Sequence, residues 1–356
     1  MQEDLVDYSR KWYILAAVGM GVLLSTIDGS IVNVSLPTLS RTFDAEFALV
    51  QWVVLAYLVT LTTLILSVGR LGDLIGKKRP YTAGFVIFTL GSVLCGMAPS
   101  IYWLIGSRVI QGFGAAMMVA LGTAIITEAF PGSERGKALG ISGSIVSTGI
   151  VIGPVLGGLL IETFSWRWIF FVNLPVGILG ILMVLRFVPA SRPKWSGRFD
   201  FLGAITLFIS LISLLFALTV GQEQGFTERL VLVLFLISIV FLVLFLLIEQ
   251  KIEHPMVDLT MFENRKFSVG LISGFLTFVA IAGTIILMPF YLENVLGYGT
   301  RTVGFFLAIV PISMGFTAPI AGSLSDRMGT RPITILGLAV LIVGYLSLTT
   351  LETSTS

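Results

Sequence analysis

The chain has 356 residues, of which 56% are hydrophobic and 12% are charged, and its formal net charge is +2. Soluble globular domains carry about 25% charged residues, whereas the mean hydropathy here is +0.98. This composition excludes an ordinary soluble domain and indicates a membrane protein, and the small net charge gives no indication of a nucleic-acid partner.

Long apolar segments recur along the chain, each near the length of about 20 residues that a helix needs to cross a bilayer. The N-terminus is polar and lacks a clear small-residue cleavage site before its apolar run, so we expect the first helix to be retained and not removed as a signal peptide. We predict eleven transmembrane helices, at residues 12–36, 48–68, 80–98, 101–126, 138–160, 168–188, 200–220, 229–249, 267–290, 302–322 and 331–350.

The distribution of Lys and Arg supports this count. Cytoplasmic loops of membrane proteins carry an excess of these residues. With the N-terminus inside, seventeen of the 22 fall in inside segments, four fall in outside segments, and Arg108 lies within a helix. We therefore predict a multi-pass protein of the cell membrane with a cytoplasmic N-terminus, in which an odd number of spans leaves the C-terminus outside.

One internal repeat has a matching place in both copies. GRLGDLIGKKRP (residues 69–80) and GSLSDRMGTRP (residues 322–332) share G-x-L-x-D-x-x-G at an offset of 253 residues. Each lies in a predicted inside loop between two helices, which indicates a duplicated half. The candidate gating residues of these loops are Gly69, Arg70, Asp73, Gly76, Lys77, Lys78 and, in the second copy, Asp326.

The residue types of the first loop indicate how it works. Gly72 and Gly76 permit tight turns, and Asp73 can accept hydrogen bonds from the start of a neighbouring helix, where free N–H groups favour an anion. Such a contact would latch a helical bundle in one orientation. The alternative for Lys77 and Lys78 is that they are only positive-inside anchors. GRLGDLIGKKR resembles the loop signature of the major facilitator superfamily between its second and third helices.

A glycine stripe marks the predicted fifth helix. In GIVIGPVLGG (residues 149–158), glycines fall four apart, so a neighbouring helix can approach closely, and a proline removes one backbone donor. The pattern also resembles the antiporter signature of the superfamily, which implies a role in the inward-to-outward change; a simple packing seam is the alternative. The motif residues are Gly149, Gly153, Pro154, Gly157 and Gly158.

Arg108 is an arginine within a predicted membrane helix, in the stretch RVIQGFGAAMM (residues 108–118). An intramembrane arginine costs about 2.5–3.5 kcal/mol even on insertion scales, so it normally faces the bundle interior or water. Snorkelling to the outer interface is the alternative. R-x-x-Q-G resembles the fourth-helix signature of the superfamily, which implies a role in proton coupling.

Asp28 lies on a small, semi-polar face of the first predicted helix. Gly21, Ser25, Val32 and Ser35 share this face at helical spacing. A carboxylate buried there can hold either a proton or a cationic substrate, and exclusion between those two states is the minimal chemistry of antiport. The alternative is a structural aspartate that caps a break in the helix.

The stretch IDGSIVNVSLP, residues 27–37, narrows the resemblance. It is similar to the first-helix signature of the fourteen-helix drug/proton antiporters, and three later stretches support this match, in residues 165–175, 254–268 and 288–300. The resemblance implies an all-α membrane bundle with eleven of fourteen helices present. We divide it into a six-helix bundle (1–190), two inserted helices (191–265) and an incomplete C-terminal bundle of three helices (266–356).

The resemblance implies a proton-coupled efflux transporter that exports amphipathic or cationic compounds by alternating access, with Asp28 and Arg108 coupling protons to substrate. Alternatives are an exporter of a specific metabolite, peptide or siderophore, and a truncated non-transporting membrane protein whose missing helices come from a partner. The chain has one Cys, one His and no ATP-binding loop. We therefore predict no enzyme, metal or cofactor; the expected partners are protons, a small-molecule substrate and the lipid bilayer.

Overall fold

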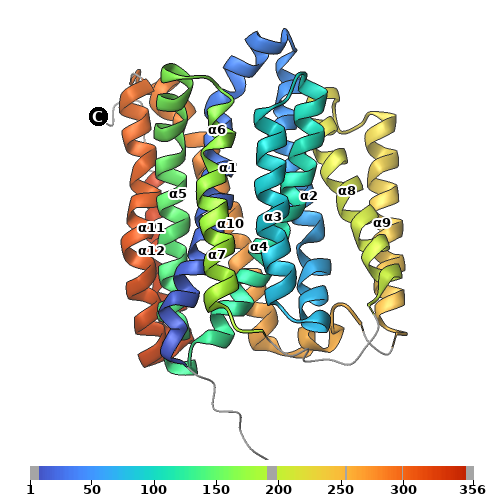
Figure 1. The fold of residues 1–356 in the computed structure, drawn as a ribbon, viewed down its shortest axis with the longest axis vertical. Helices are drawn as coiled ribbons and strands as arrows, with labels where there is room; N and C mark the ends of the chain where they lie inside the picture. Colours follow the sequence, from blue (N-terminus) through green and yellow to red (C-terminus); the bar gives the residue numbers. More distant parts are fainter. Residues whose placement is uncertain (1–7, 191–198, 253–254, 299, 350–356) are drawn as a thin grey trace, which may run out of the picture. The chain divides into compact units, whose positions relative to one another are not determined.

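The computed structural model describes residues 8–190, 199–252, 255–298 and 300–349 (Figure 1). Within these ranges the chain forms helices and contains no β-strand, which confirms the predicted all-α class. The long helices are α1 (Lys11–Phe43), α2 (Phe47–Ile75), α3 (Lys78–Gly96), α4 (Ile101–Ala129), α5 (Arg135–Thr163), α6 (Trp168–Phe171) with α7 (Asn173–Phe187), α8 (Phe201–Gln224), α9 (Arg229–Glu249), α10 (Arg265–Phe290), α11 (Thr300–Met328) and α12 (Thr330–Leu348).

Each of the eleven predicted helices corresponds to one of these segments. The segment predicted at 168–188 is interrupted at Val172, which separates α6 from α7. Ten helices in the described residues are long and apolar enough to cross a membrane. The remaining segment, α3, begins with Lys78 and Arg79 and contains several Gly, Ser and Thr residues, which lower its hydropathy.

The chain folds as two compact units. One comprises residues 1–129 and 152–259, and the other comprises residues 130–151 and 260–356, so that α5 contributes to both. The three-part division by sequence stays a prediction.

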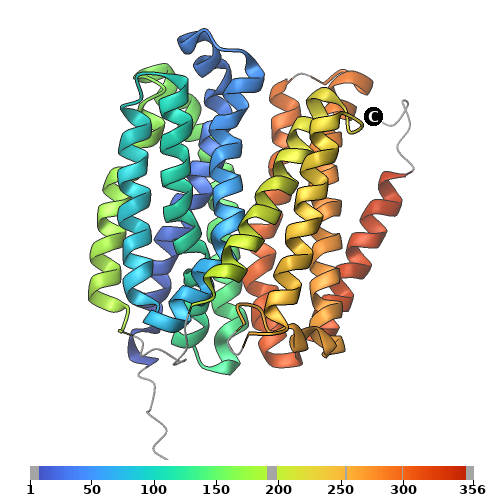
Figure 2. The ribbon, with the colours of Figure 1, turned by 90° about the vertical axis from the view of Figure 1, so that its right-hand side faces the viewer.

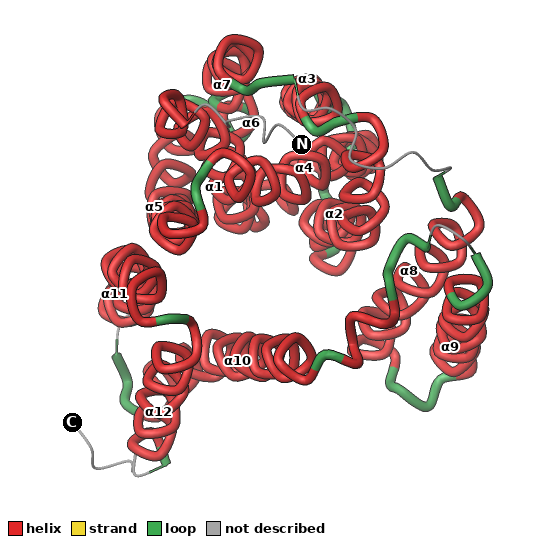
Figure 3. The backbone as a smooth tube through the Cα atoms, turned by 90° about the horizontal axis from the view of Figure 1, so that it is seen from below, coloured by secondary structure: helices red, strands yellow, loops and turns green. Residues whose placement is uncertain are grey.

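In the first unit, α4 packs against α1, α2 and α3, and α7 packs against α1 and α3. Figure 3, which views the helices end-on, shows α4 among these neighbours. Glycine allows the close approach, since a Cβ atom on Gly91 of α3 would lie 2.8 Å from the Cα of Gln111 of α4. Helices α8 and α9 form a hairpin (Figure 2), and α8 also contacts α2.

Candidate functional site

Asp28 and Arg108 form an ion pair inside the first unit. The Arg108 Nη1 lies 2.5 Å from the Asp28 Oδ2, and both side chains are fully buried. Asp28 comes from the middle of α1 and Arg108 from the eighth residue of α4. A buried carboxylate and a buried guanidinium are each costly alone, and here each supplies the charge that the other requires.

Two side-chain amides complete the bonds of Asp28. The Gln111 Nε2 donates to its Oδ1 at 2.8 Å, and the Asn173 Nδ2 donates to the same atom at 3.1 Å. Gln111 also accepts from the Arg108 Nη1 at 2.6 Å. Asn173 donates to Ser92 Oγ at 3.0 Å. The network therefore joins side chains from α1, α3, α4 and α7.

Helix α2 supplies further contacts to Arg108. The Arg108 Nε donates to the backbone oxygen of Val53 at 2.9 Å, and its guanidinium carbon lies 4.1 Å from the centre of the Tyr57 ring. The face of an aromatic ring attracts a cation, most strongly where water is absent. Its Nη2 has no hydrogen-bond partner among the described residues. Arg108 thus makes two contacts to α2 besides its bond to Asp28 of α1.

The geometry excludes snorkelling for Arg108 and a helix-capping role for Asp28. Arg108 is fully buried and paired, so it does not snorkel to the interface. Helix α1 continues through Pro37 to Phe43, and Asp28 bonds to other helices, so Asp28 does not cap a break in α1. The predicted semi-polar face of α1 is present, because Gly21, Asp28 and Ser35 are all buried.

Sequence reasoning missed four members of the network, and the signal for two of them was present. Gln111 stands in the stretch around Arg108, and Asn173 stands in FVNLP, a polar amide within an apolar segment. Ser92 and Tyr57 gave no signal, because single hydroxyl groups are ordinary in membrane helices. Only the packing of five helices shows that these groups meet at one place.

The glycine stripe of α5 faces α1 beside this network. A Cβ on Gly153 would lie 2.9 Å from the Cβ of Ser30, and one on Gly157 would lie 2.8 Å from the Cγ1 of Ile31. Ser30 and Ile31 follow Asp28 by two and three residues. A Cβ on Gly158 would meet no atom within 4 Å. Helix α5 is continuous through Pro154, and Gly149 is buried.

The first predicted gating loop is shorter than expected. Helix α2 continues to Ile75, and α3 begins at Lys78, so Gly69, Arg70 and Asp73 lie in the last turns of α2. Gly72 lies within α2 and not in a turn, and a Cβ there would meet the Leu121 side chain of α4. Gly72 therefore permits close packing of α2 against α4. Gly76 does have the predicted conformational role, with φ +85°, a region that favours glycine.

The basic residues of this segment join helix ends to one another. The Lys77 Nζ lies 2.9 Å from Glu128 Oε1 at the end of α4 and 3.1 Å from Asp73 Oδ1. Burial lowers the pKa of Lys77, but the hydrogen bonds to Glu128 and Asp73 outweigh it, so the pKa is raised. Lys78 donates to the backbone oxygen of Leu185 in the last turn of α7 at 2.9 Å. Both lysines therefore make specific contacts to neighbouring helices, besides any role as positive-inside anchors.

The second copy makes the helix-start contact expected for Asp73. In the second unit, Asp326 accepts hydrogen bonds from the backbone N–H groups of Gly136 at 2.7 Å and Lys137 at 2.8 Å, in the first turn of α5. Backbone N–H groups in the first turn of a helix are available to outside acceptors, and the positive end of the helix dipole favours a carboxylate there. Gly329 repeats the conformation of Gly76, also at φ +85°.

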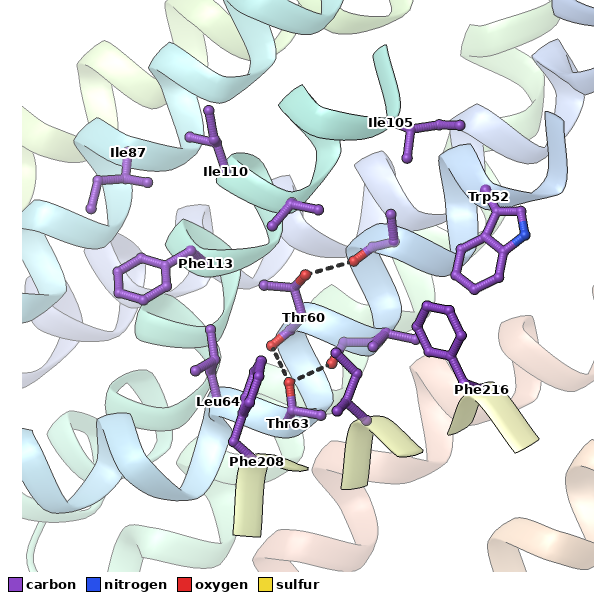
Figure 4. Close-up of a pocket in the computed structure, with 14 residues that line it drawn as sticks. Trp52, Thr60, Thr63, Leu64, Ile87, Ile105, Ile110, Phe113, Phe208 and Phe216 are labelled. Carbon is purple, nitrogen blue, oxygen red and sulfur yellow. Dashed lines mark hydrogen bonds between the residues drawn. The ribbon is translucent and has the colours of Figure 1, made fainter. Parts of the chain in front are cut away.

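An apolar pocket of about 700 Å³ lies between α2, α3, α4 and α8 (Figure 4). Trp52 and Phe216 pack together there with ring centres 4.7 Å apart. The hydroxyl groups of Thr60 and Thr63 donate to backbone oxygens of α2, so the walls are apolar. Asp28 and Arg108 do not line this pocket. In the described residues, no three His, Cys, Asp or Glu side chains are grouped to hold a metal ion.

The profile of the Major Facilitator Superfamily matches residues 18–356. The chain belongs to the major facilitator superfamily. This superfamily consists of membrane transporters and not of enzymes, and the chain is a multi-pass membrane protein. The all-helical bundle agrees with this assignment, and the family resemblance of the sequence motifs is confirmed.

Among superfamily members, the chain resembles a riboflavin transporter and several proteins with multidrug names. It is 37% identical to the riboflavin transporter RibZ of Clostridioides difficile, over 96% of this chain and 74% of that protein. It is 32% identical to the multidrug transporter protein MdtP of Bacillus subtilis, over 98% of this chain and 64% of that protein. It is 35% identical to the multidrug resistance protein Stp of Mycobacterium tuberculosis, over 94% of this chain and 62% of that protein. The chain thus spans between 62% and 74% of the lengths of these three relatives.

A solved superfamily structure shares the fold. The proton:xylose symporter XylE bound to a bromodeoxyglucose aligns over 91% of this chain and 71% of that one, with a TM-score of 0.62 and 16% sequence identity. This likeness supports the helical arrangement of the superfamily.

Proposed function

We propose that the chain forms the core of a proton-driven exporter of amphipathic or cationic compounds, with Asp28 and Arg108 as the coupling pair. The observation that carries the proposal is the fully buried ion pair between them, held by Gln111 and Asn173. An intramembrane ion pair is costly to build. A carboxylate that several helices hold in place suits a group whose protonation changes how those helices pack.

The carboxyl group of Asp28 has two protonation states, and each interacts differently with Arg108. Ionised Asp28 neutralises Arg108 and accepts hydrogen bonds from α4 and α7. A proton on Asp28 removes the negative charge, so the guanidinium loses its partner and the three helices lose one common contact. The two protonation states therefore favour different arrangements of the helices, which is the requirement for driving alternating access.

The glycine motif and the two repeat loops connect this change in helix packing to neighbouring helices. Gly153 and Gly157 let α5 pack against α1 beside Asp28, so a shift of α1 acts directly on α5. Asp326 holds the first turn of α5 from α11. We assign the gating role to these contacts and to the equivalent first loop, where Asp73 pairs with Lys77.

A specific metabolite is the second candidate substrate. RibZ is a riboflavin transporter and is 37% identical to this chain, whereas MdtP and Stp carry multidrug names. Export of a single flat, uncharged aromatic compound would use the same coupling pair with a different binding surface.

One transport experiment tests both candidates. The purified protein is reconstituted into vesicles with an acidic interior, and ethidium or riboflavin is added outside while proton release is followed with a pH-sensitive dye. We expect one of the two compounds to drive proton release and to accumulate, and Asp28→Asn to abolish both signals. Unchanged transport rate and proton release in Asp28→Asn would contradict the coupling role of Asp28.

We further propose that the N-terminus is cytoplasmic, based on the Lys and Arg distribution. Because Cys95 is the only cysteine and is buried, a single new cysteine at an exposed position reports its own side of the membrane. In intact cells we expect a membrane-impermeant maleimide to label Glu228→Cys and not Lys251→Cys. The reverse pattern would show that the orientation is inverted.

A further inference from the structure

Two buried carboxylates meet where α8 begins and α9 ends, away from the site described above. Asp200 precedes α8, and its Oδ1 accepts from the backbone N–H of Gly203 at 2.9 Å. Glu249 ends α9, and its Oε2 accepts from the backbone N–H of Val257 at 3.2 Å. Each residue is only 4% exposed. Each carboxylate thus uses one oxygen to hold a helix end or a loop.

The second oxygen of each carboxylate is without a partner. Asp200 Oδ2 and Glu249 Oε1 are buried and have no hydrogen-bond partner among the residues that the structure describes. Both atoms lie within 3.1 Å of the point where a Cβ on Gly203 would be. The two oxygens therefore face the same small space, and that space stays open because residue 203 is glycine. A buried acceptor without a donor is rare and needs an explanation.

The charges of the described residues are unequal at this site. Asp200 and Arg70 of α2 both act electrostatically on Glu249. These described groups are two carboxylates and one guanidinium, so one negative charge is in excess in the part of the site that the structure describes. One proton between the two oxygens removes that excess, because a protonated carboxyl group donates and its ionised neighbour accepts.

We propose that Asp200 and Glu249 form a proton-binding site, separate from Asp28, whose bound proton joins the start of α8 to the end of α9. This site lies next to Arg70 of the first repeat motif. Protonation here therefore controls how firmly the α8–α9 hairpin is held against the end of α2. The inference does not depend on the proposed export function.

A pocket of about 480 Å³ adjoins this site. It is lined by Gly69, Arg70, Asp73 and Thr123 and by Met256, the residue before Val257. The pocket therefore touches two neighbours of Glu249, the charged side chain of Arg70 and the loop whose Val257 N–H donates to Glu249, although Asp200 and Glu249 themselves do not line it.

Amide variants test the site without removing its contacts. In Glu249→Gln, the amide oxygen of the new side chain can still accept from the Val257 N–H, and its amide nitrogen can donate to Asp200 Oδ2. In Asp200→Asn, the oxygen can still accept from Gly203, and the nitrogen can donate to Glu249 Oε1. Each variant therefore imitates the protonated pair and is expected to fold. Glu228→Gln, at the exposed start of the same helix α9, is the matched control.

Two measurements on the purified full chain decide the question. Infrared difference spectra should show the carbonyl band of one protonated carboxylic acid in the wild type and the control, and its loss in Glu249→Gln and Asp200→Asn. The melting temperature of the wild type should fall as the pH rises and the proton leaves, because the folded state binds that proton more tightly. The amide variants should lack this fall, since their hydrogen bond has no proton to lose.

Other results would overturn the proposal. An unchanged carboxylic acid band in both amide variants would show that no proton lies between these oxygens. The same pH dependence of melting in wild type and Glu249→Gln would also refute it. Stabilisation by sodium chloride relative to choline chloride, with no carboxylic acid band, would assign the space to a metal cation instead.

Discussion

Replacing Asp28 with asparagine is expected to destabilise the protein by about 3–5 kcal/mol, because the change removes one partner of a buried ion pair and leaves the other charge uncompensated. Asparagine has nearly the same shape, so packing is retained. Arg108 would keep its bonds to Val53 and Gln111. The measurement is the free energy of unfolding in detergent at neutral pH.

A double-mutant cycle separates the charge pair from the contacts of each residue. We expect Asp28→Asn combined with Arg108→Gln to be less destabilised than the sum of the two single variants, because the double variant buries no unpaired charge. Asp44→Asn is the control: Asp44 is exposed at the end of the same helix, and asparagine tolerates its positive φ. Its effect should stay within about 0.5 kcal/mol. Additive single effects would show that the pair contributes no coupling energy.

Replacing Gly153 with alanine is expected to destabilise the packing of α5 against α1 by about 1–3 kcal/mol, as overpacking does. The new methyl group would meet Ser30, and the backbone nitrogen of Ile31 lies 3.2 Å away. The side chain of Ser30 can rotate, whereas the backbone of α1 must shift. Because Asp28 lies two residues from Ser30, we also expect slower proton-coupled transport.

Gly158→Ala is the matched control for this prediction. It makes the same change in the same motif and helix, but a Cβ there meets no atom within 4 Å. Alanine has a higher helix propensity than glycine by about 1 kcal/mol, so this variant should be neutral or slightly more stable. Equal effects of the two substitutions on stability and transport would show that helix propensity, and not the contact with α1, governs the motif.

The repeat motif shows how far local sequence can be interpreted. Its four shared residues predicted equivalent positions, and Gly76 and Gly329 indeed have the same positive φ. The motif also predicted a carboxylate at a helix start. That contact is made by Asp326 in the second copy, whereas Asp73 pairs with Lys77 in the first. Identical local sequence cannot say which neighbouring helix end is within reach.

The sequence by itself determined the membrane class, the eleven helices and the residues that carry intramembrane charge. These follow from hydropathy and from the cost of placing charge in lipid, which are local properties. Only the tertiary structure decided that Asp28 pairs with Arg108, that Gln111 and Asn173 hold the pair, and that Asp200 faces Glu249. These contacts join residues 49 to 145 positions apart, and the packing of several helices, not spacing along the chain, brings them together.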